Sequence, residues 1–299
     1  MRSHSTSRPV RAMGLAAAAV LAAGALTAGC GRSTTGSSDS GDRVASAKSA
    51  RDLLPKAVKD AGVLKAVTAV GYPPMEMYKP GTRVLTGVDP DLAAAVAKRL
   101  GLRLTLSNAE FDGLIPGIQG GRWDIAFSSV SDTAERRKAV DFVDYFRAGG
   151  SILVKKGNPE GIKTLADLCG KKIVAAKGSS NLAIAQKQAA KCGAKKMPIA
   201  QSEDAPTGLL SIDTGRADAT IVDYPAGVEY AKSGKYQVLT TQYAAGPWGA
   251  VLSRTNPDLR DAVQKALQEM RKDGTYKKIL DDYGVGINAL PAITVNTKA

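Results

Sequence analysis

Several hydroxyl groups and a guanidinium group follow one apolar, strand-like run. The stretch SSVSDTAERR contains Ser128, Ser129, Ser131 and Arg136, and it comes directly after the run WDIAF. A nucleophilic serine needs a general base, most often a histidine. The only histidine is His4, which lies in a segment that we expect to be cleaved off. Ser-His-Asp chemistry is therefore excluded for the mature chain, and these polar groups need another role.

The mature chain offers little for a metal or redox centre. Most zinc sites need histidine. The three cysteines, Cys30, Cys169 and Cys192, are too few and too scattered for a thiolate cage or a CxxC pair. The sequence also lacks a GxxxxGK[ST] phosphate loop. We therefore expect no metal and no cofactor.

The first 30 residues predict export from the cytoplasm. A basic start precedes an apolar run that is short for a membrane span, and LTAGC follows it. The stretch resembles a bacterial lipobox, although Thr27 stands where a large aliphatic residue is usual. We predict a signal peptide over residues 1–29 and lipidation of Cys30, which would anchor the chain to the outer face of the cytoplasmic membrane. An ordinary secretory signal peptide is the alternative.

Residues 30–52 predict a flexible tether, because GRSTTGSSDSGD is rich in glycine, serine and threonine and has no apolar periodicity. Cleavage of the signal peptide removes three arginines and lowers the formal net charge from +13 to +10. The basic residues are scattered and are not interleaved with aromatic residues, so we expect no nucleic-acid binding. A basic surface near anionic lipid or wall polymer is the ordinary interpretation.

The body, expected to begin near residues 53–64, alternates β-branched runs with amphipathic segments. Asp89 is predicted to cap the helix DPDLAAAVAKRLG, and Gly101 to end it. The alternation predicts an α/β architecture, and its two successive series predict two lobes. The expected strands cover residues 64–70, 102–107, 123–129, 150–156, 171–177, 197–200, 217–222 and 248–253. The expected helices cover residues 89–101, 111–121, 164–169, 179–192, 206–215, 224 onward, 256–274 and 275–284.

Several motifs in this order resemble one protein family. They are YPPMEM, VDPDLAAAVAKRLG, EFDGLIPGIQGGRWDIAFSSVSDTAERRKAVDF, LADLCGKKI, AAKGSS, GRADATIVD and DGTYKKIL. Together they resemble the family 3 extracellular solute-binding proteins, the amino-acid receptors of ABC importers. The resemblance extends from about Leu64 to Gly284, which is nearly all of the mature body.

The resemblance implies a two-lobed periplasmic-binding-protein-like fold of type II, with the ligand in the cleft between the lobes. It places two hinge crossovers near residues 146–151 and 243–248. The first lobe would be discontinuous and the second continuous. The implied ranges are residues 53–147 plus 248–290 for the first lobe, 148–247 for the second and 291–299 for a C-terminal tail.

The resemblance also implies a site for a zwitterion, whose two charges must both be matched when they leave water. Arg136 would bind the carboxylate through its planar fork, and Asp223, at the end of the strand-like run ATIV, would bind the ammonium. The other implied contacts are Ser128, Ser129, Ser131, Gly178, Ser179, Ser180 and the aromatic walls Tyr72 and Phe111. Alternative roles are a turn or helix cap for the serines, a helix cap for Asp223 and core packing for the two aromatic residues.

Two features remain open at this level. Some family members carry an acidic residue shortly before the tyrosine, and TAVGY lacks it, which argues against a cationic ligand side chain unless Glu76 or Asp132 substitutes. Cys169 and Cys192 lie outside the reducing cytosol, and we predict a disulfide between them, which by closing a loop of about 24 residues would contribute about 3 kcal/mol. Two free thiols are the alternative for these cysteines.

We therefore expect a monomeric binding protein that captures a free, polar amino acid by hinge closure. Its partners would be that amino acid, an ABC permease and, through the lipid anchor, the membrane. One alternative is a same-fold enzyme of the cyclohexadienyl dehydratase type, with Glu76 or Asp132 as the acid. Another alternative is an extracellular sensor domain.

Overall fold

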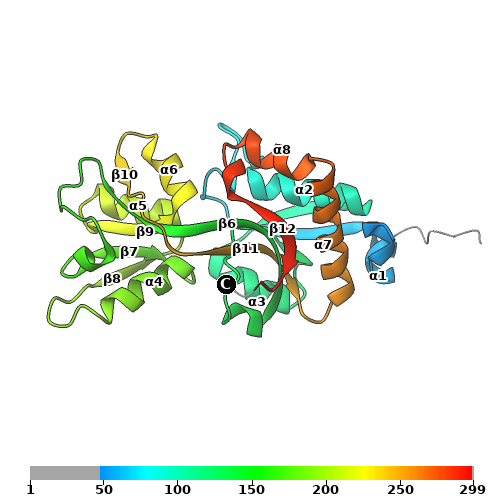
Figure 1. Ribbon diagram of the computed structural model, residues 1–299, viewed down its shortest axis with the longest axis horizontal. Coiled ribbons are helices and arrows are strands. Elements are labelled where there is room, and N and C mark those ends of the chain that lie inside the picture. Colours follow the sequence, from blue (N-terminus) through cyan, green and yellow to red (C-terminus); the bar gives the residue numbers. More distant parts are fainter. Residues whose placement is uncertain (1–47, 298–299) are drawn as a thin grey trace, which may run out of the picture. The chain divides into compact units, whose positions relative to one another are not determined.

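The computed structural model describes residues 48–297, so the predicted signal peptide and Cys30 lie outside the described residues. No helix within residues 48–297 has both the length and the apolar character needed to cross a membrane. In chain order the elements (Figure 1) are η1 (Ala50–Leu53), α1 (Lys56–Ala61), β1 (Val63–Thr68), β2 (Met77–Tyr78), β3 (Leu85–Thr86), α2 (Val88–Leu100), β4 (Arg103–Asn108), η2 (Phe111–Gly113), α3 (Leu114–Gln119), β5 (Ile125–Ala126), η3 (Arg136–Lys138), β6 (Val140–Lys155), η4 (Leu165–Leu168), β7 (Ile173–Ala176), α4 (Ser180–Ala189), β8 (Ile199–Ser202), α5 (Ala205–Asp213), β9 (Ala219–Asp223), α6 (Tyr224–Ala231), β10 (Tyr236–Val238), β11 (Tyr243–Ser253), α7 (Pro257–Lys272), α8 (Thr275–Asp282), η5 (Gly286–Asn288) and β12 (Ala289–Val295).

One sheet runs through the fold in the strand order β4-β1-β5-β11-β6-β9-β7-β8, and β10 and β12 also pair with β6. Strands β4, β1 and β5 are parallel, and so are β9, β7 and β8. The long strands β6 and β11 pair antiparallel and connect these two groups (Figure 1). The crossovers predicted at residues 146–151 and 243–248 fall within β6 and β11.

Each parallel group belongs to a lobe with its own hydrophobic core, which confirms the two-lobed α/β fold. We call β1, β4, β5, α2, α3, α7 and α8 the first lobe, and β7 to β10 with α4 to α6 the second lobe. In the first lobe, fully buried Leu92 and Leu267 bring α2 and α7 into one core cluster. In the second lobe, Ile173 and Ile221 of neighbouring strands pack with Ala185 of α4. The two cores allow the lobes to act as separate rigid bodies.

The helix predicted over residues 89–101 starts differently from the prediction. It begins at Val88, and the N-cap residue is Gly87, whose φ of +128° is a conformation that glycine adopts readily. A Cβ atom at Gly87 would lie 2.2 Å from the carbonyl oxygen of Met75, so this position excludes a side chain. Asp89 is therefore not the cap. It is fully buried in the first turn of α2, where it accepts hydrogen bonds from the Ser129 amide and the Tyr145 hydroxyl.

Both ends of the body also differ from the predicted limits. Ala50 in η1 is 1% exposed and packs with Leu54 in the first-lobe core, so the fold begins before residue 53. Residues 291–299 were predicted to be a tail, but β12 extends to Val295 and pairs with β6. The carbonyl oxygen of Ile293 in β12 accepts hydrogen bonds from α7. The C-terminal strand is therefore part of the first-lobe structure.

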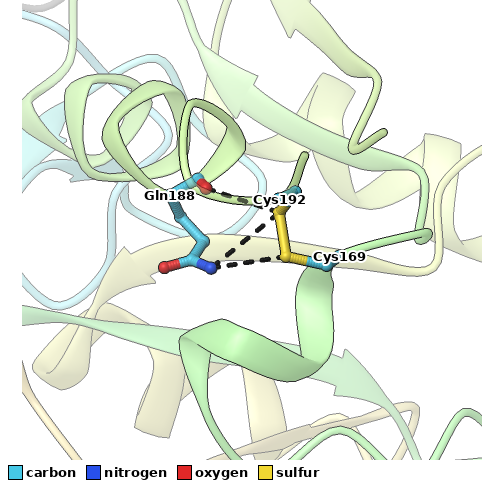
Figure 2. The surroundings of a disulfide bond; sticks show 3 residues. All are labelled: Cys169, Gln188 and Cys192. Atoms are coloured by element: carbon cyan, nitrogen blue, oxygen red, sulfur yellow. Dashed lines mark hydrogen bonds between the residues drawn. A yellow bond between two sulfur atoms is a disulfide. The ribbon is translucent and has the colours of Figure 1, made fainter. Parts of the chain in front are cut away.

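The predicted disulfide between Cys169 and Cys192 is present in the second lobe (Figure 2), with 5.3 Å between the two Cα atoms. Cys169 follows η4, and Cys192 lies shortly after α4. The side-chain amide nitrogen of Gln188 lies 3.5 Å from the Cys169 sulfur and 3.9 Å from the Cys192 sulfur. The disulfide therefore ties the end of α4 to the segment that precedes β7.

Candidate functional site

A cavity of about 120 Å³ lies where strands of both lobes end. In the first lobe it is lined by segments that follow β1, β4 and β5, and in the second by segments that follow β7 and β8 and by the end of β9. The carboxyl ends of strands are where open α/β sheets bind ligands. The polar and aromatic lining residues are Tyr72, Glu76, Asn108, Glu110, Phe111, Ser128, Ser129, Ser179, Ser180, Asn181, Ser202, Glu203, Asp204, Thr220 and Asp223.

The turn YPPME places Tyr72 and Glu76 side by side at the cavity. The Tyr72 amide donates to the Glu76 carbonyl oxygen at 2.9 Å, and the Glu76 amide donates to the Tyr72 carbonyl oxygen at 3.0 Å. The Tyr72 hydroxyl donates to Asp223 Oδ2 at 2.8 Å and accepts from the Asp223 amide at 2.7 Å. Tyr72 of the first lobe therefore contacts a strand end of the second lobe directly.

Asp223 lies at the N-cap position of α6, but its side chain makes no capping hydrogen bond. Its carboxylate accepts from the Tyr72 hydroxyl and, at 3.2 Å, from Asn181 Nδ2. Burial raises the pKa of Asp223 to about 6, against the lowering effect of these hydrogen bonds and of the Arg136 charge. Above that pH the group is a buried carboxylate that can pair with a cation in the cavity.

Ser128 and Ser129 hydrogen-bond to buried carboxyl groups and cap no helix. The Ser128 hydroxyl accepts from the Ala69 amide at 2.9 Å and donates to Glu76 Oε1 at 3.3 Å. Ser129 has a φ of +50°, which costs a non-glycine residue about 1–2 kcal/mol. This conformation directs its amide to Asp89 Oδ2 at 2.7 Å. Burial and the charge of Asp89 raise the pKa of Glu76 well above its ordinary range.

The other three predicted serines lie where the lobes meet. The Ser131 and Ser180 hydroxyl oxygens are 3.0 Å apart and join the lobes through a hydrogen bond. Ser179 caps α4, because its hydroxyl accepts from the Leu182 amide at 3.0 Å, and it also lines the cavity. The capping role and the predicted site position therefore coexist at Ser179.

Arg136 lies beside the cavity rather than among its lining residues. It lines an adjoining hollow of about 80 Å³ together with Gly178, while Phe111 lines both spaces. Its two terminal nitrogens donate to the carbonyl oxygens of Ser131, at 2.9 Å, and Gly178, at 3.0 Å. Its guanidinium carbon lies 5.6 Å from the centre of the Phe111 ring. The assignment of the ligand carboxylate to Arg136 stays a prediction.

The cavity lining is acidic. It includes the carboxyl groups of Glu76, Glu110, Glu203, Asp204 and Asp223, and no lysine or arginine of residues 48–297 lines it. A lining with five carboxyl groups and with no lysine or arginine from the described residues favours a ligand that carries positive charge.

Asp132, which the sequence offered as an acid beside Glu76, lies outside the cavity. It pairs with Arg137 at 3.1 Å, and its carboxyl group faces Asp144. Of the two acids suggested from the sequence, Glu76 is therefore the one that lines the cavity.

Sequence reasoning missed Asn181, Glu203 and Asp204. Asp204 caps α5 by accepting from the Thr207 amide at 2.7 Å, and Glu203 precedes it directly after β8. An acidic residue between a strand and the next helix was the signal that identified Asp223. The same signal, applied after β8, would have found both residues.

Comparisons with known proteins agree with this geometry. Residues 64–286 match the family model of the bacterial extracellular solute-binding proteins, family 3. The L-cystine-binding protein TcyJ of Escherichia coli (strain K12) is 30% identical over 229 residues, which cover 76% of this chain and 84% of that protein. The structure of an ancestral arginine-binding protein bound to arginine has a TM-score of 0.70 and 34% identity, over 75% of this chain and 98% of the other.

One solved structure concerns the enzyme alternative. The ancestral amino acid-binding protein AncCDT-1, a precursor of cyclohexadienyl dehydratase, has a TM-score of 0.69 and 33% identity, over 76% of this chain and 97% of the other. It is itself named as a binding protein, and so are the two proteins above. The match to the family model covers most of the chain. The chain belongs to the bacterial extracellular solute-binding proteins, family 3, the amino-acid receptors of ABC importers.

Proposed function

We propose that this protein captures a free amino acid between its two lobes and presents it to an ABC permease. The observation that carries the proposal is the position of Asp223, a buried second-lobe carboxylate that the Tyr72 hydroxyl of the first lobe reaches at 2.8 Å. In this proposal Asp223 pairs with the ligand ammonium. Arg136 exchanges its two carbonyl acceptors for the ligand carboxylate.

Hinge closure follows from the separation of these charges. Arg136 comes from the first lobe and Asp223 from the second, so the ligand contacts both only when the lobes are together. A ligand that makes more contacts in one arrangement shifts the population toward it. The proposed lobes are residues 50–147 plus 248–295 and residues 148–247, and they move about the crossovers in β6 and β11.

The remaining proposed contacts surround the two charged groups. Tyr72 and Phe111 form aromatic walls, and Asn181 holds the Asp223 carboxylate. The hydroxyl and backbone groups proposed to contact the ligand are those of Ser128, Ser129, Ser131, Gly178, Ser179 and Ser180.

A binding screen tests the proposal. A ligand present at a hundredfold to thousandfold excess over its dissociation constant adds about 3–4 kcal/mol of stability. At least one natural amino acid should therefore raise the melting temperature and bind in a calorimeter. The failure of every natural amino acid in both measurements would contradict the proposal.

Paired variants test the two charged contacts. Arg136→Lys loses the planar fork and should weaken binding by about tenfold to hundredfold, the worth of a hydrogen bond to a charged group. Arg137→Lys is the matched control, because Arg137 pairs with Asp132 outside the cavity and should bind as the wild type does. Asp223→Asn should lose the ammonium contact. Retention of wild-type affinity by Asp223→Asn would exclude the proposed site.

We also propose that the mature chain is a monomer tethered to the membrane through a lipid on Cys30. Residues 1–29 are the signal peptide in this proposal, and the residues from Cys30 up to the start of η1 at Ala50 are the tether. Wild-type protein should fractionate with membranes and carry acyl chains by mass spectrometry, whereas Cys30→Ser should not be lipidated. An unmodified wild-type chain in the medium would favour ordinary secretion.

A further inference from the structure

Glu76, which lines the cavity, and Asp89, which is buried next to it, share one hydroxyl group. Ser129 Oγ lies 3.1 Å from Asp89 Oδ2 and 3.2 Å from Glu76 Oε2. A serine hydroxyl has a single proton and can donate to only one of them. Asp89 already has two other hydrogen-bond donors, because it also accepts from the Ser129 amide and from the Tyr145 hydroxyl. The simplest assignment leaves Asp89 ionised and makes the Glu76 carboxyl the donor to Ser129.

The surroundings favour a single shared negative charge. Glu76 is 2% exposed and Asp89 is fully buried. Among the ion pairs of residues 48–297, none involves Glu76 or Asp89. Two carboxyl groups that are buried next to each other cannot both ionise without a large cost in free energy. One proton therefore stays on the pair until a cation arrives.

The groups that face Glu76 include other acids but no base. Asp89, Tyr145 and Tyr230 interact electrostatically with Glu76. The other titratable groups that line the same cavity are Tyr72, Glu110, Glu203, Asp204 and Asp223. Each of these is neutral or negative at neutral pH. A cationic ligand side chain would be the first positive charge to reach Glu76 within this part of the described chain.

We infer that a ligand with a cationic side chain displaces the proton of Glu76, and this inference rests on the proposed function. Glu76 would then act as a proton-exchanging group that selects lysine-like or arginine-like amino acids. The O–H bond of Glu76 breaks, the proton leaves to solvent, and the carboxylate pairs with the incoming cation. A neutral side chain of the same shape binds while Glu76 keeps its proton. Glu76 would thereby substitute for the acidic residue that TAVGY lacks, as the sequence had allowed.

Proton counting by calorimetry tests this inference. Binding of L-arginine and of L-citrulline, its neutral isostere, is measured near pH 6.5 in buffers of different ionisation enthalpy. Asp223 contributes equally to both ligands because their main chains are identical. L-arginine should release up to about one proton more than L-citrulline, and its affinity relative to L-citrulline should rise up to about tenfold per pH unit.

Glu76→Gln supplies the matched variant, because glutamine resembles the protonated glutamate and cannot release a proton. It should weaken L-arginine binding by about tenfold to hundredfold, leave L-citrulline binding within a few-fold and abolish the proton difference. Glu135→Gln, at a surface glutamate that pairs with Lys138, should preserve the difference.

Several results would overturn the inference. They are equal proton counts for the two ligands, an unchanged difference in Glu76→Gln, and binding of neutral amino acids alone. In each of these cases amino-acid binding itself would survive. A failure of every amino acid to bind would overturn the proposed function as well.

Discussion

Asp132 and Asp144 form a second buried carboxyl pair, which does not line the cavity. Asp132 is 4% exposed and Asp144 is fully buried, and the Oδ1 atom of each has no hydrogen-bond partner among the described residues. Asp132 Oδ2 accepts from Arg137, and Asp144 Oδ2 accepts from the Thr297 amide at 3.1 Å and the Thr294 hydroxyl at 3.3 Å. The two groups can be neighbours if they share one proton.

The shared proton links the stability of the fold to pH. Burial and the charge of Asp144 raise the pKa of Asp132 from 3.8 to about 7. Between these values the folded chain keeps a proton that the unfolded chain has lost, so the stabilisation is lost as the pH rises through about 7. A shift of about three units corresponds to about 4 kcal/mol, and partial screening near the solvent-reaching Arg137 reduces our expectation to about 2 kcal/mol.

Asp144→Asn replaces the shared proton with a permanent donor. The side-chain nitrogen of the introduced asparagine can donate to Asp132, and its side-chain oxygen can still accept from Thr294 and Thr297. In urea denaturation followed by tryptophan fluorescence, the variant should match the wild type near pH 4, where Asp132 is protonated in most of the folded chains. Near pH 8 its free energy of unfolding should be about 2 kcal/mol higher, because Asp132 no longer faces a carboxylate.

Asp141→Asn is the control for this measurement. Asp141 lies on the same strand and pairs with Arg260, so its loss should lower the free energy of unfolding by a similar amount at both pH values. The reasoning is refuted if Asp144→Asn differs from the wild type by the same amount near pH 4 and near pH 8.

Three further predictions follow from single contacts. Replacement of Cys169 and Cys192 by serine should lower the free energy of unfolding in urea by about 3 kcal/mol, the loop-entropy value for this separation; a loss well below 1 kcal/mol would contradict it. Tyr72→Phe removes the hydroxyl that donates to Asp223 and should weaken amino-acid binding in a calorimeter by about tenfold to hundredfold, and unchanged affinity would argue against this contact. Gly178→Ala should lower the free energy of unfolding by about 1–2 kcal/mol, because the φ of +72° disfavours a side chain; wild-type stability would show that the loop adapts.

Local patterns in the sequence predicted most of the elements. The helix predicted over residues 256–274 corresponds closely to α7, whose apolar residues Leu259, Val263 and Leu267 recur at helical spacing and are all buried. The run ATIV predicted β9 and placed Asp223 at its end. Such patterns are readable because backbone propensity and hydrophobic periodicity act between near neighbours.

Some boundaries depended on contacts that are distant in sequence. The strand expected over residues 123–129 is only Ile125–Ala126, because the chain turns at Ser129, where the φ of +50° directs the amide to Asp89. The start of α2 was set by the close approach of Gly87 to the Met75 carbonyl oxygen. Neither contact leaves a periodic signal in the sequence.

By itself, the sequence determined the α/β class and the strand ends that would carry polar groups, because these follow from residue type and short-range spacing. Only the tertiary structure decided which acids share a proton and which line the cavity. Glu76 and Asp132 looked equivalent in the sequence, yet one lines the cavity beside Asp89 and the other faces Asp144 outside it. The charge state of a buried carboxyl group depends on the donors and charges that packing brings within a few ångströms, and those come from residues far apart in the chain.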